Sequence, residues 1–295
     1  MDYIFDAFEP AFMQRALIGS LIAVVATSLV GTWVVLRGLA FLGDALAHGV
    51  IPGIALAVLW GFSPIIGAFI AALVMSGLVT VVSTRTAVRE DTAIGLLFVG
   101  MLSLGIVIVS RARSFSTEVT ALLFGDVLGV TVADIRTQLV ATAVVAVITV
   151  VLYRPFLALT FNRIKAQTLG MRPRLAHAAL LTLLALSIVA SFQAIGTLLV
   201  FGLLVGPPAT ASLLVQRVRI IMMTSIALGA AAVVAGLVVS FHHGTAGGAT
   251  IAGFSVLQFF IVLIGREIVQ ALRNAGPSKD APPPAIASLA PRFQS

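Results

Sequence analysis

The stretch L-A-F-L-G-D-A-L-A-H-G-V-I-P-G-I-A-L-A-V-L-W, Leu39–Trp60, places a carboxylate and an imidazole inside an apolar run. An ionisable side chain at the centre of a bilayer costs roughly 2.5–3.5 kcal/mol or more, so such residues mark functional positions. Asp44 and His48 are four residues apart and therefore leave the same face of a helix. The glycines beside them and the following Pro52-Gly53 predict a broken or bent helix, which needs protein or water around its freed backbone groups.

Composition sets the class of protein. The chain has 295 residues, of which 60% are hydrophobic and 10% charged, and its mean hydropathy is +1.14. A soluble domain carries about 25% charged residues, so the sequence predicts an integral α-helical membrane protein. The net charge of +7 does not indicate nucleic-acid binding, because the basic residues lie in short loops between apolar runs. Cysteine is absent, which excludes disulfides and thiolate ligands.

The predicted fold is an all-α polytopic membrane protein with about 8–9 transmembrane helices, some of them broken. Each apolar run approaches the roughly 20 residues that a spanning helix requires. The Ala176–Ala190 run is short, and Leu39–Trp60 need not cross as one regular helix. The nine candidate runs are Ala16–Leu36, Leu39–Trp60, Pro64–Val82, Thr92–Val109, Val132–Leu152, Ala176–Ala190, Ile195–Val215, Ile220–Val239 and Ala249–Ala271.

Orientation follows from the basic residues. With nine spans and the N-terminus outside, 14 of the 18 Lys and Arg residues fall on one side, which predicts a cytoplasmic C-terminus. We expect residues 1–15 to form an extracytoplasmic segment and residues 16–272 the transmembrane domain. The proline-rich residues 273–295 read as a disordered cytoplasmic tail.

Two loops carry further predictions. Residues 114–133, on the outer side, include Glu118 and Asp126 and predict a short outer or re-entrant helix. Together with Asp134 these acids give the outer rim a negative charge that could attract a divalent cation, although an ordinary solvated loop is the slightly better explanation. Residues 154–175 form the longest cytoplasmic connection, with apolar residues spaced for a short amphipathic helix. That helix is typical either of a membrane surface rich in anionic lipid or of docking to a cytoplasmic motor subunit.

Three passages resemble the integral-membrane permease of manganese/zinc ABC importers, the ABC-3 family. They are L-R-G-L-A-F-L-G-D-A-L-A-H-G-V-I-P-G-I-A-L (Leu36–Leu56), T-A-L-L-F-G-D-V-L-G-V (Thr120–Val130) and I-G-T-L-L-V-F-G-L-L-V-G-P-P-A-T-A (Ile195–Ala211). Ala47 and Gly49 stand where many relatives have serine and alanine. The resemblance implies a second copy of the chain, two cytoplasmic ATPase subunits and an extracytoplasmic metal-binding protein.

The resemblance also implies functional residues. Asp44 and His48 would act on the transported Mn²⁺ or Zn²⁺, and no permanently bound cofactor is expected. The helix seated on the ATPase would include Ala166 to Met171, within a coupling segment that contains Arg163, Ile164, Lys165, Ala166, Leu169 and Gly170.

The residues alone support a metal role for the acid–imidazole pair. A carboxylate oxygen and an imidazole nitrogen provide two ligands of a shell that normally has four in a closed site. Water, another segment or the same pair from a second copy would supply the rest. The competing interpretations are a helix N-cap for Asp44 and a core imidazole for His48. His242 and His243, before a glycine-rich turn, are weaker candidates for metal entry, because adjacent loop histidines are usually solvated.

The Gly206-Pro207-Pro208 sequence predicts an interruption of the seventh span, because proline removes a helical hydrogen bond. A kink lining the pathway and simple packing are both compatible with it. Small residues at Gly229 and Gly236 predict close helix contacts on the eighth span.

Energy has to come from another chain if transport is ATP-driven, because no G-x-x-x-x-G-K-[ST] sequence is present. The main alternative is a proton-coupled secondary transporter in which Asp44 and His48 relay protons. A structural or channel-forming membrane protein is a third possibility. Asp and His ligands suit manganese, zinc and iron(II) alike.

Overall fold

The structure is a computed structural model that describes residues 6–86, 88–111, 129–161 and 173–274. Its described part is built from α-helices in agreement with the predicted class. The helices are α2 (Ala11–Leu36), α3 (Ala40–Gly49), α4 (Ile51–Trp60), α5 (Pro64–Arg85), α6 (Glu90–Arg111), α8 (Val132–Val151), α9 (Tyr153–Phe161), α11 (Pro173–Ile195), α12 (Thr197–Leu214), α13 (Val218–His243) and α14 (Gly247–Asn274).

The predicted spans correspond closely to these helices. Within the described ranges, nine segments are long and apolar enough to cross a membrane, with α3 and α4 together forming one of them. Two helices extend beyond their predicted apolar runs. The first span begins at Ala11, inside the predicted N-terminal segment, and α11 is a full-length helix rather than a short one. Apolar periodicity locates the middle of a span, whereas polar residues at its ends, such as Gln14 and Arg15, still belong to the helix.

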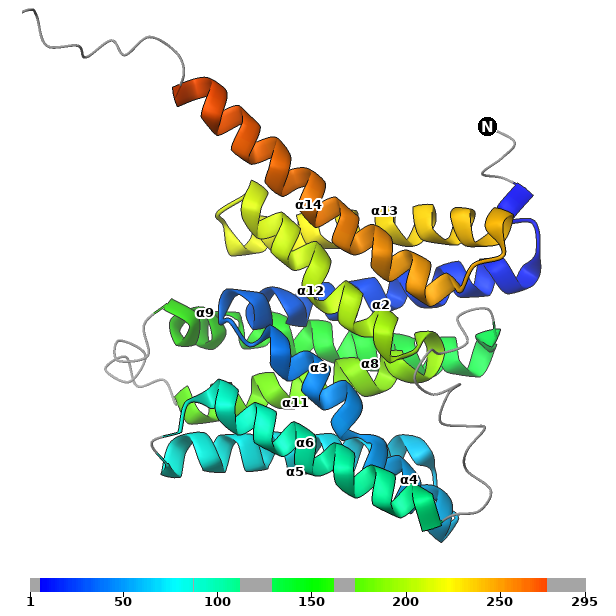
Figure 1. The fold of residues 1–295 in the computed structure, drawn as a ribbon, viewed down its shortest axis with the longest axis vertical. Coiled ribbons are helices and arrows are strands. Elements are labelled where there is room, and N and C mark those ends of the chain that lie inside the picture. Colours follow the sequence, from blue (N-terminus) through cyan, green and yellow to red (C-terminus); the bar gives the residue numbers. More distant parts are fainter. Residues whose placement is uncertain (1–5, 87, 112–128, 162–172, 275–295) are drawn as a thin grey trace, which may run out of the picture.

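The helices form two sets of different direction (Figure 1). α14, α12, α3 with α4, and α6 run diagonally across the view, whereas α13, α2, α8, α11 and α5 run roughly horizontally. Contacts between the sets include α12 on α2, α14 on α13 and α4 on α5. The start of α2 and the end of α14 lie at opposite sides of the view (Figure 1).

The second span is broken at Val50. α3 ends at Gly49, and α4 begins at Ile51 with Pro52 in its first turn, so the prediction of a broken helix was correct. Gly53 of α4 then meets Gly67 of α5 with backbone against backbone, because a Cβ at either position would run into the other's carbonyl oxygen. α4 is therefore packed tightly on α5, and Gly61, in the left-handed conformation with φ 72°, ends it.

α12 is continuous through Gly206-Pro207-Pro208, so the predicted interruption there was wrong. Pro207 and Pro208 remove the hydrogen bonds to the carbonyls four residues earlier, a cost that neighbouring helices must offset. The carbonyl of Leu204, freed by Pro208, lies against Gly31 of α2, where a side chain would not fit. Close packing on α2 thus holds the helix together where the sequence alone indicates a break.

α8 has a polar inner face and an apolar outer face. Its buried side chains are Gln138, Thr142, Val145 and Thr149. Valines and a leucine cover its exposed side, including Val140 and others along the helix. This inversion of the pattern of a soluble helix is what a lipid-facing span requires.

Side-chain contacts join helix ends that the predicted topology puts on one side of the membrane. Arg37, after the end of α2, lies 3.1 Å from His177 in the first turns of α11. Trp33 packs edge-on against Tyr153 at the start of α9, with ring centroids 5.5 Å apart. Arg219, at the start of α13, lies over the Tyr153 ring at 5.2 Å. These contacts agree with the alternating crossings inferred from the basic residues.

Candidate metal site

Asp44 and His48 lie together on α3. His48 Nδ1 is 3.5 Å from Asp44 Oδ1, and each side chain is 29% exposed. At a rise of 1.5 Å per residue, His48 is about 12 Å into a span of about 30 Å. α3 begins at Ala40, so Asp44 is not the N-cap of the helix and the capping interpretation fails. The two side chains therefore stand at membrane depth on a face that the chain itself leaves partly open.

The hydrogen bond of His48 fixes which nitrogen is free. Nδ1 lies 3.1 Å from the backbone carbonyl oxygen of Asp44, and a carbonyl only accepts. Nδ1 therefore carries the proton and donates it to this carbonyl, which leaves the lone pair on Nε2. A ring held through one nitrogen and free at the other is the usual arrangement of a metal-binding histidine.

Neighbouring helices position α3 through close contacts. A side chain at Gly43 would meet Leu204 of α12, and one at Gly49 would meet the sulfur of Met75 on α5. The ring of Phe98 on α6 stands perpendicular to His48, with centroids 6.0 Å apart. Three helices thus set the height and rotation of the acid–imidazole pair.

The other proposed ligands do not join this pair in the described structure. His242 Nδ1 donates to the carbonyl of Val238, 2.9 Å away, at the end of α13, and His243 beside it is exposed. Asp134 caps α8: its Oδ2 accepts from Thr131 N at 3.0 Å and from Thr131 Oγ1 at 2.6 Å. Over the described ranges, no three His, Cys, Asp or Glu side chains gather into a possible metal site.

Several predicted residues lie outside the described ranges. They are Glu118 and Asp126 of the outer loop, and Arg163, Ile164, Lys165, Ala166, Leu169 and Gly170 of the coupling segment. The described part of that connection is α9, where Phe156 and Leu159 are buried, in keeping with an amphipathic helix.

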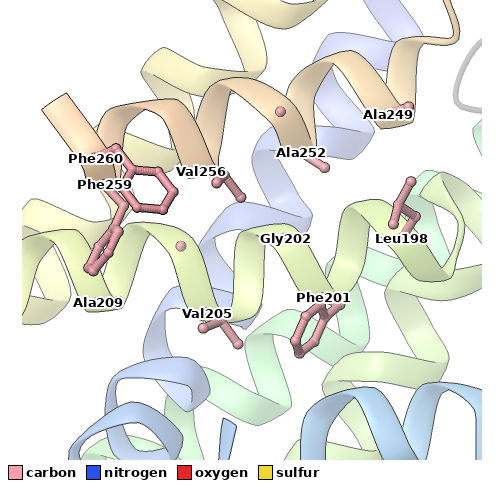
Figure 2. Close-up of a pocket in the computed structure, with 12 residues that line it drawn as sticks. Leu198, Phe201, Gly202, Val205, Ala209, Ala249, Ala252, Val256, Phe259 and Phe260 are labelled. Atoms are coloured by element: carbon pink, nitrogen blue, oxygen red, sulfur yellow. The ribbon is translucent and has the colours of Figure 1, made fainter. Parts of the chain in front are cut away.

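A large apolar groove lies between α12 and α14 (Figure 2). It encloses about 660 Å³, and its walls carry only glycine and apolar side chains, with Phe201 on α12 and Phe259 and Phe260 on α14. Nothing in these walls can bind a dication. The groove therefore contributes no metal ligand to the Asp44–His48 pair on α3.

Sequence reasoning missed three contacts, one at the acid–imidazole pair and two at the ends of other helices. Phe98 is 50 positions from His48, and no periodic pattern connects them. His177 is buried, with 8% of its side chain exposed, and lies between Arg37 and Glu90. The only sequence signal for the Arg37–His177–Glu90 contacts is that all three residues lie near helix ends on the side rich in basic residues.

Known proteins resemble this chain over most of its length. Residues 9–266 match the model of the ABC 3 transport family. The manganese import system permease protein ScaB of Streptococcus parasanguinis is 34% identical over 267 residues, covering 89% of this chain and 95% of that protein. A probable iron transport system membrane protein of Haemophilus influenzae is 33% identical, covering 90% of this chain and 98% of that protein.

A solved structure shares the fold. PsaBC from Streptococcus pneumoniae, in complex with Fab, superposes with a TM-score of 0.79 at 30% identity and covers 88% of this chain and 94% of the matched chain. The family match spans both the α3 pair and the α12 prolines. This chain therefore belongs to the ABC 3 transport family and is a multi-pass permease of the plasma membrane.

Proposed function

We propose that this permease carries divalent transition-metal ions, Mn²⁺ or Zn²⁺, into the cell, and that Asp44 and His48 bind the ion on its way. The observation that carries the proposal is the pairing of the Asp44 carboxylate with a His48 ring whose Nε2 is free. Oxygen and imidazole nitrogen donors suit manganese, iron(II) and zinc. Relatives named for manganese and for iron transport support the same class of cargo.

A second copy of the chain completes the site in this proposal. One protomer supplies two ligands, whereas a four-coordinate ion needs four. In a lone chain the 29% exposed pair would face lipid, at a cost of several kcal/mol. Two copies related by a two-fold axis would bring two carboxylates and two imidazoles together. A shell shared between two chains also opens when they move apart, so the ion is released without breaking a closed cage.

Energy and delivery come from partners in this account. The chain has no phosphate-binding loop, so two cytoplasmic ATPase subunits would supply the driving force. The coupling segment before α11 would dock on them. An extracytoplasmic metal-binding protein would deliver the ion to the outer side, and His48 and Asp44 would replace part of its hydration shell inside the membrane.

Radioactive manganese uptake tests the site. In cells that depend on this system, the double variant Asp44→Ala, His48→Ala should lose nearly all ⁵⁴Mn²⁺ uptake while reaching the membrane in normal amount. Each single variant should weaken apparent affinity by about 10-fold or more, because even residues that only orient metal ligands change affinity by about 10–100-fold when mutated. Asp91→Asn, an exposed acid without a place in the site, is the control.

Normal uptake by the double variant would reject the site. Uptake by the purified permease alone, driven by a pH gradient, would instead favour the proton-coupled mechanism. Competition by Zn²⁺ and Fe²⁺ against ⁵⁴Mn²⁺ uptake in the same cells would rank the three metals by apparent affinity.

A further inference from the structure

Arg37, His177 and Glu90 form a connected group at one end of the helix bundle. Arg37 Nη1 lies 3.1 Å from His177 Nδ1, and His177 Nε2 lies 3.5 Å from Glu90 Oε1. The three residues belong to the end of α2, the first turns of α11 and the first residue of α6. His177 is nearly buried, with 8% of its side chain exposed, whereas Glu90 is 32% exposed.

Geometry fixes the proton on the bridging ring. A guanidinium only donates, so His177 Nδ1 must accept from Arg37 and carries no proton. The neutral ring then has its proton on Nε2, which points to Glu90. Arg37 donates to His177, and His177 donates toward the carboxylate. The buried ring therefore lies between a cation and an anion, and both polarise it.

The two contacts of His177 differ in length. The Arg37–His177 distance is that of a normal hydrogen bond, whereas 3.5 Å between His177 and Glu90 is too long for a good one. Glu90 Oε1 is buried and makes no other hydrogen bond among the described residues. A small displacement of α11 relative to α6 would therefore strengthen or break this contact first.

The group connects two regions that the proposed transport cycle has to link. α11 starts at Pro173, directly after the proposed coupling segment, so His177 is about one turn from it. Glu90 begins α6, and Phe98, two turns further along the same helix, packs on His48. A rigid helix thus joins Glu90 to the ring that borders the acid–imidazole pair.

We infer that Arg37, His177 and Glu90 act as a relay that transmits movement of α11 to α6, and so links ATP hydrolysis to the position of His48. The inference rests on the proposed function and adds positioning residues to it. His177 binds no metal in this account. It converts a shift of the cytoplasmic end of α11 into a shift of α6 through the His177–Glu90 contact, while Arg37 holds the ring orientation.

The test compares Mn²⁺ uptake with ATP hydrolysis in proteoliposomes that contain the permease, its ATPase subunits and the metal-binding protein. In His177→Leu, basal ATPase activity should persist, whereas Mn²⁺ taken up per ATP should fall by about fivefold or more, the lower range of allosteric coupling factors. His177→Gln should restore coupling, because an amide has an acceptor for Arg37 and a donor for Glu90.

Glu90→Ala provides a second route if His177→Leu fails to assemble, and Asp91→Ala, an exposed acid beside it, is the matched control. Glu90→Ala should lower coupling like His177→Leu, whereas Asp91→Ala should not. Lower thermal stability with unchanged Mn²⁺ per ATP in both variants would overturn the relay and leave a structural contact. Absence of Mn²⁺-stimulated hydrolysis in the wild-type assembly would instead reject the proposed function.

Discussion

Two of the contacts of His48 orient its ring, and each sets one degree of freedom. The hydrogen bond to the Asp44 carbonyl fixes the tautomer, whereas the perpendicular Phe98 ring limits rotation about the side chain. A ligand whose orientation is set before the ion arrives loses less conformational freedom on binding. Phe98 is therefore expected to affect affinity without binding the ion.

At the scale of this residue, Phe98→Leu should raise the manganese concentration for half-maximal uptake by up to about 10-fold, at the low end of effects on residues that orient ligands. The maximal rate should change little. Phe41→Leu is the control, because Phe41 packs on Phe98 at 6.0 Å and has no ring contact with His48 among those described. Equal effects of the two substitutions would show that general packing, rather than contact with His48, is responsible.

The sequence predicted the pair but not its surroundings. An acid and an imidazole four positions apart on one helix are visible in any sequence, because helical geometry alone brings them together. Contacts to Phe98, Leu204 and Met75 depend on how separate helices pack, which apolar periodicity does not determine. The same reason explains why the contacts of His177 with Arg37 and Glu90 could not be predicted.

At the scale of helices, α4 and α5 approach through two glycines. Gly53→Ala and Gly67→Ala each place a methyl group against the opposite backbone. Overpacking of this kind typically costs about 1–3 kcal/mol. The double variant should cost less than the sum of the single variants, because the first substitution already separates the helices.

Thermal unfolding of the purified permease in detergent measures this coupling. Gly77→Ala on α5 is the control, since a side chain there meets nothing within 4 Å. It should be neutral or stabilising, as alanine favours a helix by about 1 kcal/mol over glycine. Additive losses from Gly53→Ala and Gly67→Ala would contradict the close contact.

The comparison between α3–α4 and α12 explains why one predicted break was correct and the other was not. Both segments contain a glycine beside proline. Pro52 falls in the first turn of α4, where its missing N–H costs nothing, so a new helix begins there. Pro207 and Pro208 lie in the interior of α12, where α2 packs against them and the helix continues. The deciding factor is tertiary packing, which the local sequence does not contain.

At the scale of the whole molecule, the distribution of basic residues predicts the direction of every span. The chain has no cysteine, so single cysteines introduced at its surface report accessibility directly. Ser63→Cys, between α4 and α5, should react with a membrane-impermeant maleimide in intact cells. Val88→Cys, between α5 and α6, should react only after the membrane is permeabilised. The opposite pattern would place the C-terminus outside.

The break at Val50 has a mechanical consequence for the span that carries the acid and the imidazole. The half formed by α4 packs on the backbone of α5 at Gly53, and the half formed by α3 ends at Gly49, two residues before α4 begins at Ile51. A small change of angle at Val50 would move Asp44 and His48 relative to α4, within the limits that Leu204 at Gly43 and Met75 at Gly49 allow. If Asp44 and His48 bind the ion as proposed, such a hinge would shift both side chains while α4 stays packed on α5 at Gly53 and Gly67.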